Sequence, residues 1–164
     1  MLAIKTILHP TDFSERSNFA FRLACSLARD YGARLMVVHV AEPPVPIYGN
    51  GLVLPPAQAP KETVLARLQQ LLPKDPKVQV EHRLTEGDAA IEILRIAGEI
   101  KCDLIVMGTH GRTGLGRLLM GSVAEQVVRK AACPVLTVKT PQHAMPFSEE
   151  LVAVAAGQSA EAAP

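Results

Sequence analysis

Apolar and polar positions divide this chain into short apolar runs and longer amphipathic segments. Nearly continuous apolar runs occupy residues 2–8, 34–40, 103–107 and 134–138, and each has the length of one buried strand. Residues 78–84 alternate between apolar and polar side chains, which indicates a strand nearer the edge of a sheet. The pattern therefore predicts five strands.

Segments with helical periodicity lie between these strands. Residues 14–31 predict a helix that ends at Gly32, a residue suited to the left-handed turn after a helix. Further helices are predicted at 61–72, from Asp88 as N-cap to Ile100, and at 122–131. The apolar faces expected are Ala20, Leu23, Ala24, Leu27, Ala28 and Tyr31 in the first helix, Val64, Leu65, Leu68, Leu71 and Leu72 in the second, and Ile91, Leu94, Ile96, Ala97 and Ile100 in the third.

Strands that alternate with helices predict an α/β fold with a parallel sheet and helices on both faces. The simplest arrangement is an open, doubly wound five-stranded sheet in the order 3-2-1-4-5. The strand order then reverses between strands 1 and 4, where ligands of such sheets bind. We expect one domain over residues 1–139 and a mobile tail over 140–164, with one short helix near 148–156.

Residues 41–60 depart from this pattern because they hold six prolines, two glycines and only one charged residue, Glu42. Long loops of this kind are usually functional or disordered. The apolar residues within the segment argue against a purely solvated linker. Two interpretations stay open: the segment covers a site or a partner surface, or it packs on the domain.

Composition narrows the class of protein. The chain has 164 residues and a formal net charge of +1, which gives no electrostatic case for binding nucleic acid or an anionic membrane. Tryptophan is absent, and no apolar stretch reaches the length of a membrane span. The three cysteines are scattered singly, with no metal-ligand spacing, and suit a reducing compartment. A cytoplasmic protein without a metal centre is the expectation.

Candidate chemistry is concentrated in residues 108–122, which hold five of the eleven glycines. This loop follows a predicted strand and leads into a predicted helix. Glycine allows backbone amides to approach an anion closely, and the helix N-terminus adds unpaired donors and a favourable dipole. The segment therefore predicts a phosphate-binding loop.

Two common phosphate motifs do not fit this loop. The residues from Gly111 to Leu118 lack the lysine and the Ser/Thr of a P-loop. A dinucleotide fingerprint that starts at Gly114 fails because position 119 is leucine. The paired carboxylates or triads that fast catalysis needs are also missing near the loop.

Several polar residues near the predicted crevice have two interpretations. Asp12 either binds a ribose diol or caps the helix that begins near residue 14, a role that Thr11 and Ser14 could share. Ser122 fits a capping box with Glu125, yet capping leaves other first-turn amides free for phosphate.

Three further side chains of the loop stay open in the same way. His110 is a ligand for phosphate or a metal-bound phosphate, or donates to a backbone carbonyl. Arg112 and Arg117 either neutralise phosphate or lie solvated at the surface.

The spacing Gly108-x2-Gly111-x9-Gly121-Ser122 resembles the ATP-binding motif of the universal stress protein family. The Pro-Thr-Asp-Phe-Ser sequence at residues 10–14 and the Cys-Pro-Val-Leu-Thr-Val sequence at 133–138 also look like that family. The resemblance covers about residues 1–139. It implies the 3-2-1-4-5 sheet, an adenine nucleotide in the crevice, and a homodimer that pairs through the strand at 134–138.

The resemblance also implies roles for single residues. Asp12 would contact ribose at the end of the Pro10-Thr11 segment, and Val40 with Met107 would flank adenine. Arg112 belongs to the same candidate nucleotide-binding set. The residues implied around the phosphates are Gly108, His110, Gly111, Gly121, Ser122 and Val123.

Three functions follow from these observations. The favoured one is a homodimeric stress-response regulator that binds ATP or another adenine nucleotide, with magnesium, as a switch. The alternatives are an enzyme that hydrolyses ATP slowly and an interaction module that works without nucleotide. The inducing signal, the protein partners and the choice among ATP, AMP and cyclic nucleotides are not determined by the sequence.

Overall fold

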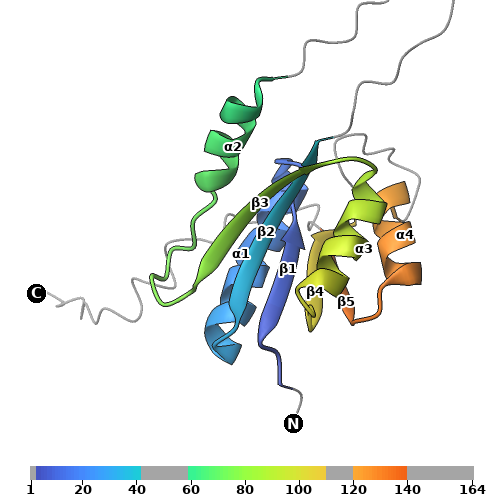
Figure 1. Ribbon diagram of the computed structural model, residues 1–164. Helices are drawn as coiled ribbons and strands as arrows, with labels where there is room; N and C mark the ends of the chain where they lie inside the picture. Colours follow the sequence, from blue (N-terminus) through green and yellow to red (C-terminus); the bar gives the residue numbers. More distant parts are fainter. Residues whose placement is uncertain (1–2, 42–58, 110–119, 140–164) are drawn as a thin grey trace, which may run out of the picture.

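The computed structural model describes residues 3–41, 59–109 and 120–139, and every structural statement below refers to these ranges. Five parallel strands form one sheet in the order β3-β2-β1-β4-β5 (Figure 1). The predicted fold class and strand order are therefore confirmed. The elements are β1 (Thr6–Pro10), α1 (Glu15–Tyr31), β2 (Arg34–Ala41), α2 (Lys61–Gln69), β3 (Val80–Glu86), α3 (Ala89–Glu99), β4 (Leu104–Gly108), α4 (Ser122–Lys130) and β5 (Val135–Val138).

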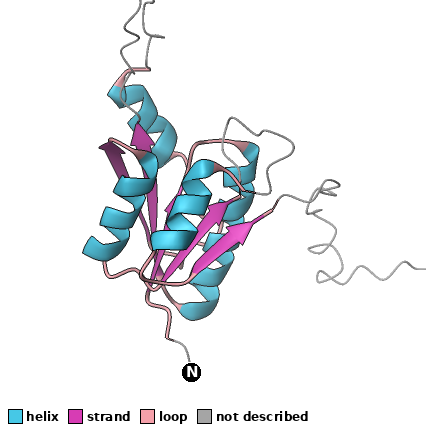
Figure 2. Cartoon of the chain, turned by 90° about the vertical axis from the view of Figure 1, so that its right-hand side faces the viewer, coloured by secondary structure: helices cyan, strands magenta, loops and turns pink. Residues whose placement is uncertain are grey.

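The central strand β1 pairs with both β2 and β4, and its residues are buried by helices on both faces. Ile7 belongs to the core on the α1 and α2 side, whereas Leu8 belongs to the core on the α3 and α4 side. This alternation follows from the two-residue period of a strand. Figure 2 shows helices on both sides of the sheet.

Local sequence explains where the well-formed helices begin and end. The Ser14 side chain caps α1 by accepting from Ser17 N, and Gly32 ends that helix with a left-handed φ of 62°. The Asp88 side chain caps α3 by accepting from Ile91 N at 2.9 Å. The predicted stop at Gly32 and the predicted cap at Asp88 are thus confirmed.

Four apolar positions expected in the core lie at the surface instead. Tyr31 is 50% exposed, Leu65 is 38% exposed, Ile91 is 61% exposed and Leu72 is 62% exposed. Tyr31 is the last residue of α1, and Ile91 lies in the first turn of α3. Leu72 also lies beyond α2, which ends at Gln69 rather than at residue 72.

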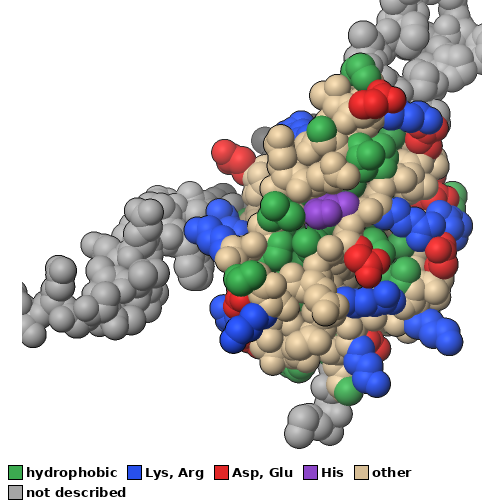
Figure 3. Space-filling model, turned by 60° about the vertical axis from the view of Figure 1, so that its left-hand side comes forward, with side chains coloured by type: hydrophobic (Ala, Val, Ile, Leu, Met, Phe, Trp, Pro, Cys, Tyr) green, Lys and Arg blue, Asp and Glu red, His purple; other side chains and the backbone are tan. Residues whose placement is uncertain are grey.

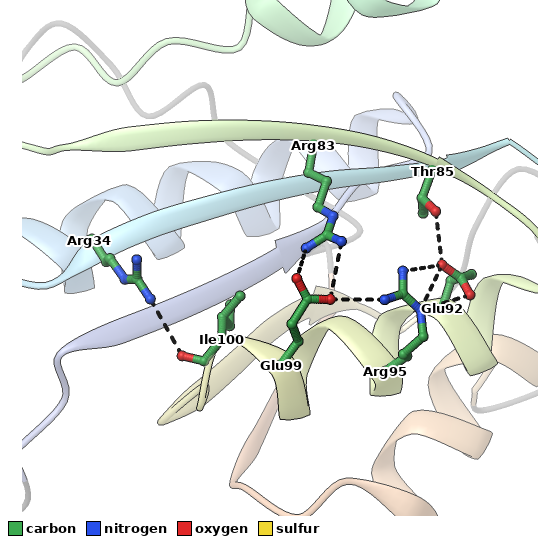
Figure 4. Close-up of polar contacts among 7 residues, drawn as sticks. All are labelled: Arg34, Arg83, Thr85, Glu92, Arg95, Glu99 and Ile100. Atoms are coloured by element: carbon green, nitrogen blue, oxygen red, sulfur yellow. Dashed lines mark hydrogen bonds and ion pairs between the residues drawn. The ribbon is translucent and has the colours of Figure 1, made fainter.

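A cluster of ion pairs joins α3 to the edge strand β3 (Figure 4). Arg83 of β3 binds Glu99 through both terminal nitrogens, at 2.8 and 3.1 Å. Arg95 lies between Glu92 and Glu99 and donates to both carboxylates, at 2.7 and 2.9 Å. Hydrogen bonds from Arg95 and from the Thr85 hydroxyl lower the pKa of Glu92 to about 2. The cluster fixes α3 against the outer strand of the sheet.

Charged side chains of both signs share the surface, in keeping with the formal net charge of +1. On the face shown in Figure 3, Lys and Arg side chains are interspersed with Asp and Glu. Among the described helices, none has the length and apolar character that crossing a bilayer requires. The predicted loop at 41–60 and the predicted tail at 140–164 lie almost wholly outside the described residues.

Candidate functional site

The carboxyl ends of β2, β1 and β4 meet at one edge of the sheet. Leu8 and Met107 belong to the core beneath α3 and α4, and Val40 packs against that same core. Pro10 stands two residues after Leu8, so the alternation of the strand places it on the same face. We call Pro10, Val40 and Met107 the apolar ledge, a group on the α3 and α4 side of the sheet in which Met107 is buried and Pro10 and Val40 are half-buried.

The loop after β1 holds the Asp12 carboxylate in a fixed orientation. Asp12 Oδ1 accepts from the Ser14 backbone amide at 3.0 Å and from the Ser14 hydroxyl at 2.7 Å. The Ser14 hydroxyl in turn accepts from Ser17 N at 3.2 Å, which makes Ser14 the cap of α1. Asp12 therefore does not cap the helix itself but orients the residue that does.

Thr11 uses its polar atoms within the protein. The Thr11 amide donates to the Val38 carbonyl at 2.8 Å, which continues the pairing of β1 with β2. The Thr11 hydroxyl accepts from Phe13 N at 3.1 Å and from the Ser17 hydroxyl at 2.8 Å. Its side chain is 6% exposed, so Thr11 shapes the loop from below.

Phe13 has a backbone conformation that sequence reasoning did not anticipate. Its φ of 63° lies in the left-handed region, which a bulky L-residue rarely adopts. The only sequence signal was its position between a strand end and a helix cap, where the chain must reverse sharply. Strained residues of this kind cluster at functional sites.

The N-terminus of α4 lies after the candidate phosphate-binding loop. Gly121 is the N-cap, and its amide donates to the Thr109 carbonyl at 2.7 Å. The first intrahelical bond of the described helix is from Glu125 N to the Gly121 carbonyl, at 2.9 Å. The amides of Ser122, Val123 and Ala124 precede that bond, so they are the first-turn donors that a helix leaves for another acceptor.

The predicted capping box is wrong. Ser122 is the first residue of α4 rather than its cap, and the helix has no side-chain cap hydrogen bond. The cap position belongs to Gly121 because its extended backbone, with φ −74° and ψ 157°, already turns the chain into the helix. The first turn is therefore not closed by the Ser122 hydroxyl.

His9 lies fully buried below this edge of the sheet. Its Nδ1 donates to the Val106 carbonyl of β4 at 2.8 Å, and its Nε2 has no hydrogen-bond partner in the described residues. Burial lowers the pKa of His9 to about 4, against smaller opposing effects of the Val106 bond and of Asp12. The imidazole is thus neutral near pH 7 and links β1 to β4.

The structure describes most, but not all, of the predicted site residues. It brings Pro10, Val40 and Met107 to one face, with Gly108 and Asp12 at the ends of neighbouring strands. The hydrogen bond from Gly121 N to the carbonyl of Thr109, which follows β4, places the start of α4 near this edge. The predicted residues His110, Gly111 and Arg112 lie outside the described residues.

The donor set at this edge suits an adenine nucleotide. The apolar ledge offers a surface for a flat base, the Asp12 carboxylate is an acceptor for a sugar diol, and the first-turn amides of α4 are donors for phosphate oxygens. Within the described ranges, no three His, Cys, Asp or Glu side chains gather in a way that could hold a metal ion. The described groups at this edge supply hydrogen-bond acceptors and donors beside an apolar group.

Comparison with known proteins gives an independent result. The sequence model of the universal stress protein family matches residues 3–139. A universal stress protein of Methanocaldococcus jannaschii is 38% identical over 148 residues, which cover 84% of each chain.

Solved structures agree with the sequence relatives. The hypothetical protein MJ0577 superposes with a TM-score of 0.69 at 25% identity, covering 86% of this chain and 99% of that one. A universal stress protein in complex with cyclic AMP superposes with a TM-score of 0.63 at 28% identity, covering 85% and 99%. One structural relative thus binds an adenine nucleotide.

Proposed function

Because this chain belongs to the universal stress protein family, we propose that it binds an adenine nucleotide at the carboxyl edge of β1 and β4. The nucleotide we infer is ATP with magnesium, and the role is that of a regulatory switch in the stress response. The nucleotide would be held rather than rapidly cleaved, since the site consists mainly of backbone donors and one carboxylate.

One observation carries the proposal. The apolar ledge, the Asp12 carboxylate and the first-turn amides of α4 come from distant parts of the chain and meet at one edge of the sheet. A base, a sugar and a phosphate chain need these three chemistries next to one another. The structural relative in complex with cyclic AMP supports the choice of adenine.

Each part of the site then has a task. Asp12 accepts hydrogen bonds from the ribose hydroxyls, and Val40 with Met107 flanks the adenine. The amides of Ser122 and Val123 donate to phosphate oxygens, and Gly108 and Gly121 allow the backbone to approach them. We propose His110, Gly111 and Arg112 as the remaining phosphate contacts. When magnesium accompanies ATP, it neutralises part of the phosphate charge.

Calorimetric titration of the purified chain with ATP and magnesium tests the proposal. We expect saturable binding of ATP. AMP and cyclic AMP should compete with ATP for the site, and GTP should compete more weakly. The double substitution Gly108→Val with Gly121→Val should abolish binding, because two side chains would then fill the space that the phosphates need.

A matched control is Gly98→Val, which places a similar side chain in the exposed last turn of α3, away from the site. This variant should keep the affinity of the native chain. Absence of binding at millimolar ATP, or equal affinity in the double variant, would rule the proposal out.

We further propose that two copies of the chain pair through β5. This strand lies at one edge of the sheet, and its Leu136 side chain is 37% exposed. An edge strand presents unpaired backbone donors and acceptors that a second copy can satisfy.

A further inference from the structure

Helix α2 contacts the Asp12 loop at the strained residue Phe13. The guanidinium carbon of Arg67 lies 4.4 Å from the centre of the Phe13 ring. An Arg67 terminal nitrogen also donates to the Phe13 carbonyl at 3.5 Å. One side chain of α2 therefore contacts both the ring and the backbone of Phe13.

The imidazole ring of His39, in β2, also contacts the Phe13 ring. The centres of the Phe13 and His39 rings are 4.4 Å apart, with an angle of 39° between the ring planes. His39 Nδ1 donates to the Thr11 carbonyl at 2.7 Å, so the imidazole is anchored to the same loop. Phe13 is thus held by Arg67 and His39, two residues that lie far from it in the sequence.

The conformation of Phe13 needs such support. A left-handed backbone costs an L-residue roughly 1–2 kcal/mol, and it persists only where the surroundings determine it. At Phe13 these surroundings include the cation–π contact with Arg67, the ring contact with His39 and the hydrogen bond from Phe13 N to the Thr11 hydroxyl. Without them, the Phe13 backbone is expected to relax toward negative φ.

Relaxation of Phe13 would move Asp12. The hydrogen bonds from Ser14 to Asp12 Oδ1 span Phe13, so they require the chain to reverse at that residue. If φ changes there, the carboxylate loses both bonds and its fixed direction. The orientation of Asp12 consequently depends on a contact made by α2.

Arg67 is well suited to be the adjustable part of this arrangement. Helix α2 buries only Leu68, and Arg67 itself is exposed. Further contacts of this region with the sheet include an ion pair from Lys61 to Glu86 and a hydrogen bond from His82 to the Leu71 carbonyl. Figure 1 shows α2 beside the sheet, apart from α3 and α4.

We propose that Arg67 is a positioning residue for ribose recognition: through Phe13 it holds Asp12 in the orientation that accepts the ribose hydroxyls. This inference rests on the proposed nucleotide site and adds to it a determinant of ribose affinity on α2. Docking of α2 and affinity for the sugar are thereby coupled.

The test compares ATP with 2′,3′-dideoxy-ATP, which lacks the hydroxyls that Asp12 would bind. The native chain should bind ATP about ten-fold more tightly, the factor expected for a hydrogen bond to a charged group. Arg67→Ala should weaken ATP about five-fold, the factor for an exposed cation–π contact, and leave dideoxy-ATP unchanged. A merely structural role would weaken both ligands alike.

Three further variants examine the route from Arg67 through Phe13 to Asp12. Glycine adopts positive φ without strain, so in a Phe13→Gly background Arg67→Ala should change the ATP dissociation constant by less than about two-fold. Arg67→Lys keeps the charge but loses the flat guanidinium, and it should resemble Arg67→Ala. Asp12→Asn should remove the preference for ATP altogether.

Arg22→Ala is the matched control, since Arg22 lies over the Phe19 ring at 5.5 Å on α1 and is exposed. It should keep the native ratio of the two affinities. If Arg67→Ala leaves the ratio of the ATP and dideoxy-ATP affinities unchanged, this inference is overturned, while ATP binding by the native chain stands. If the native chain binds no ATP, both this inference and the proposed function fail.

Discussion

At the scale of the residue, His9 limits the pH range over which the fold is stable. Its imidazole is fully buried, and burial lowers its pKa from 6.5 to about 4. The unfolded chain takes up this proton near pH 6.5, whereas the folded chain does so only near pH 4. Between these values the unfolded state binds more protons. The contribution of His9 to the free energy of unfolding is therefore fully present above pH 6.5 and is lost as the pH falls toward 4.

We therefore predict that the free energy of unfolding drops by about 3 kcal/mol between pH 7 and pH 4 from this residue alone. Urea denaturation followed by circular dichroism at a series of pH values measures the drop. His9→Gln keeps an amide that can donate to the Val106 carbonyl and does not titrate, so its stability should lack this dependence. The same slope in both proteins would contradict the role of His9.

Phe13 shows what single-residue patterns miss. In the sequence it belonged only to the Pro-Thr-Asp-Phe-Ser segment, yet it holds a left-handed conformation between Arg67 and His39. Ser122 shows the opposite error. A capping motif was present, but the chain entered α4 one residue earlier, at Gly121.

At the scale of the element, the turn between β3 and α3 depends on Gly87. Its φ of 142° is unfavourable for any side chain, and an added Cβ would lie 3.1 Å from Glu92 Cγ. The turn aligns α3 for the ion pairs with Arg83 that Figure 4 shows. Gly98, in the last turn of the same helix, has neither constraint.

We predict that Gly87→Ala destabilises the protein by about 2 kcal/mol because of its backbone strain. Gly98→Ala should instead stabilise it by about 0.5 kcal/mol, since alanine favours the helix. Thermal unfolding of the two variants beside the native chain measures both effects. A Gly87→Ala protein as stable as the native one would show that the turn tolerates a side chain.

At the scale of the whole molecule, the two edges of the sheet differ. The β3 edge is joined to α3 by ion pairs and lies beside α2, whereas β5 ends the sheet on the other side with Leu136 exposed. Pairing through β5 would extend the sheet across two copies and leave both carboxyl edges accessible.

If two copies pair through β5 as proposed, we predict that Leu136→Lys converts the dimer to a monomer, because a buried lysine on the strand edge would disfavour pairing. Sedimentation velocity at several concentrations distinguishes the two states. Gln79→Lys, an exposed change next to the opposite edge strand, should leave the dimer intact. A monomeric native chain, or a dimer that survives Leu136→Lys, would exclude pairing through this strand.

The sequence by itself determined the fold and its family. Apolar runs and helical periodicity are local, so they predicted the five strands, and the residue type of Asp88 predicted the cap of α3. The strand order was predicted from the simplest doubly wound arrangement and from the family resemblance. The glycine spacing and the Asp12 segment led to the family that the comparisons confirm.

Only the tertiary structure decided how the ends of the strands combine. The apolar ledge, the buried His9 between β1 and β4, and the contact of Arg67 with Phe13 join residues distant in the chain. A linear pattern records which residues are apolar or charged and how they are spaced. It does not record the strand register or the helix docking that bring them within a few ångströms of one another, and those contacts determine the orientation of Asp12.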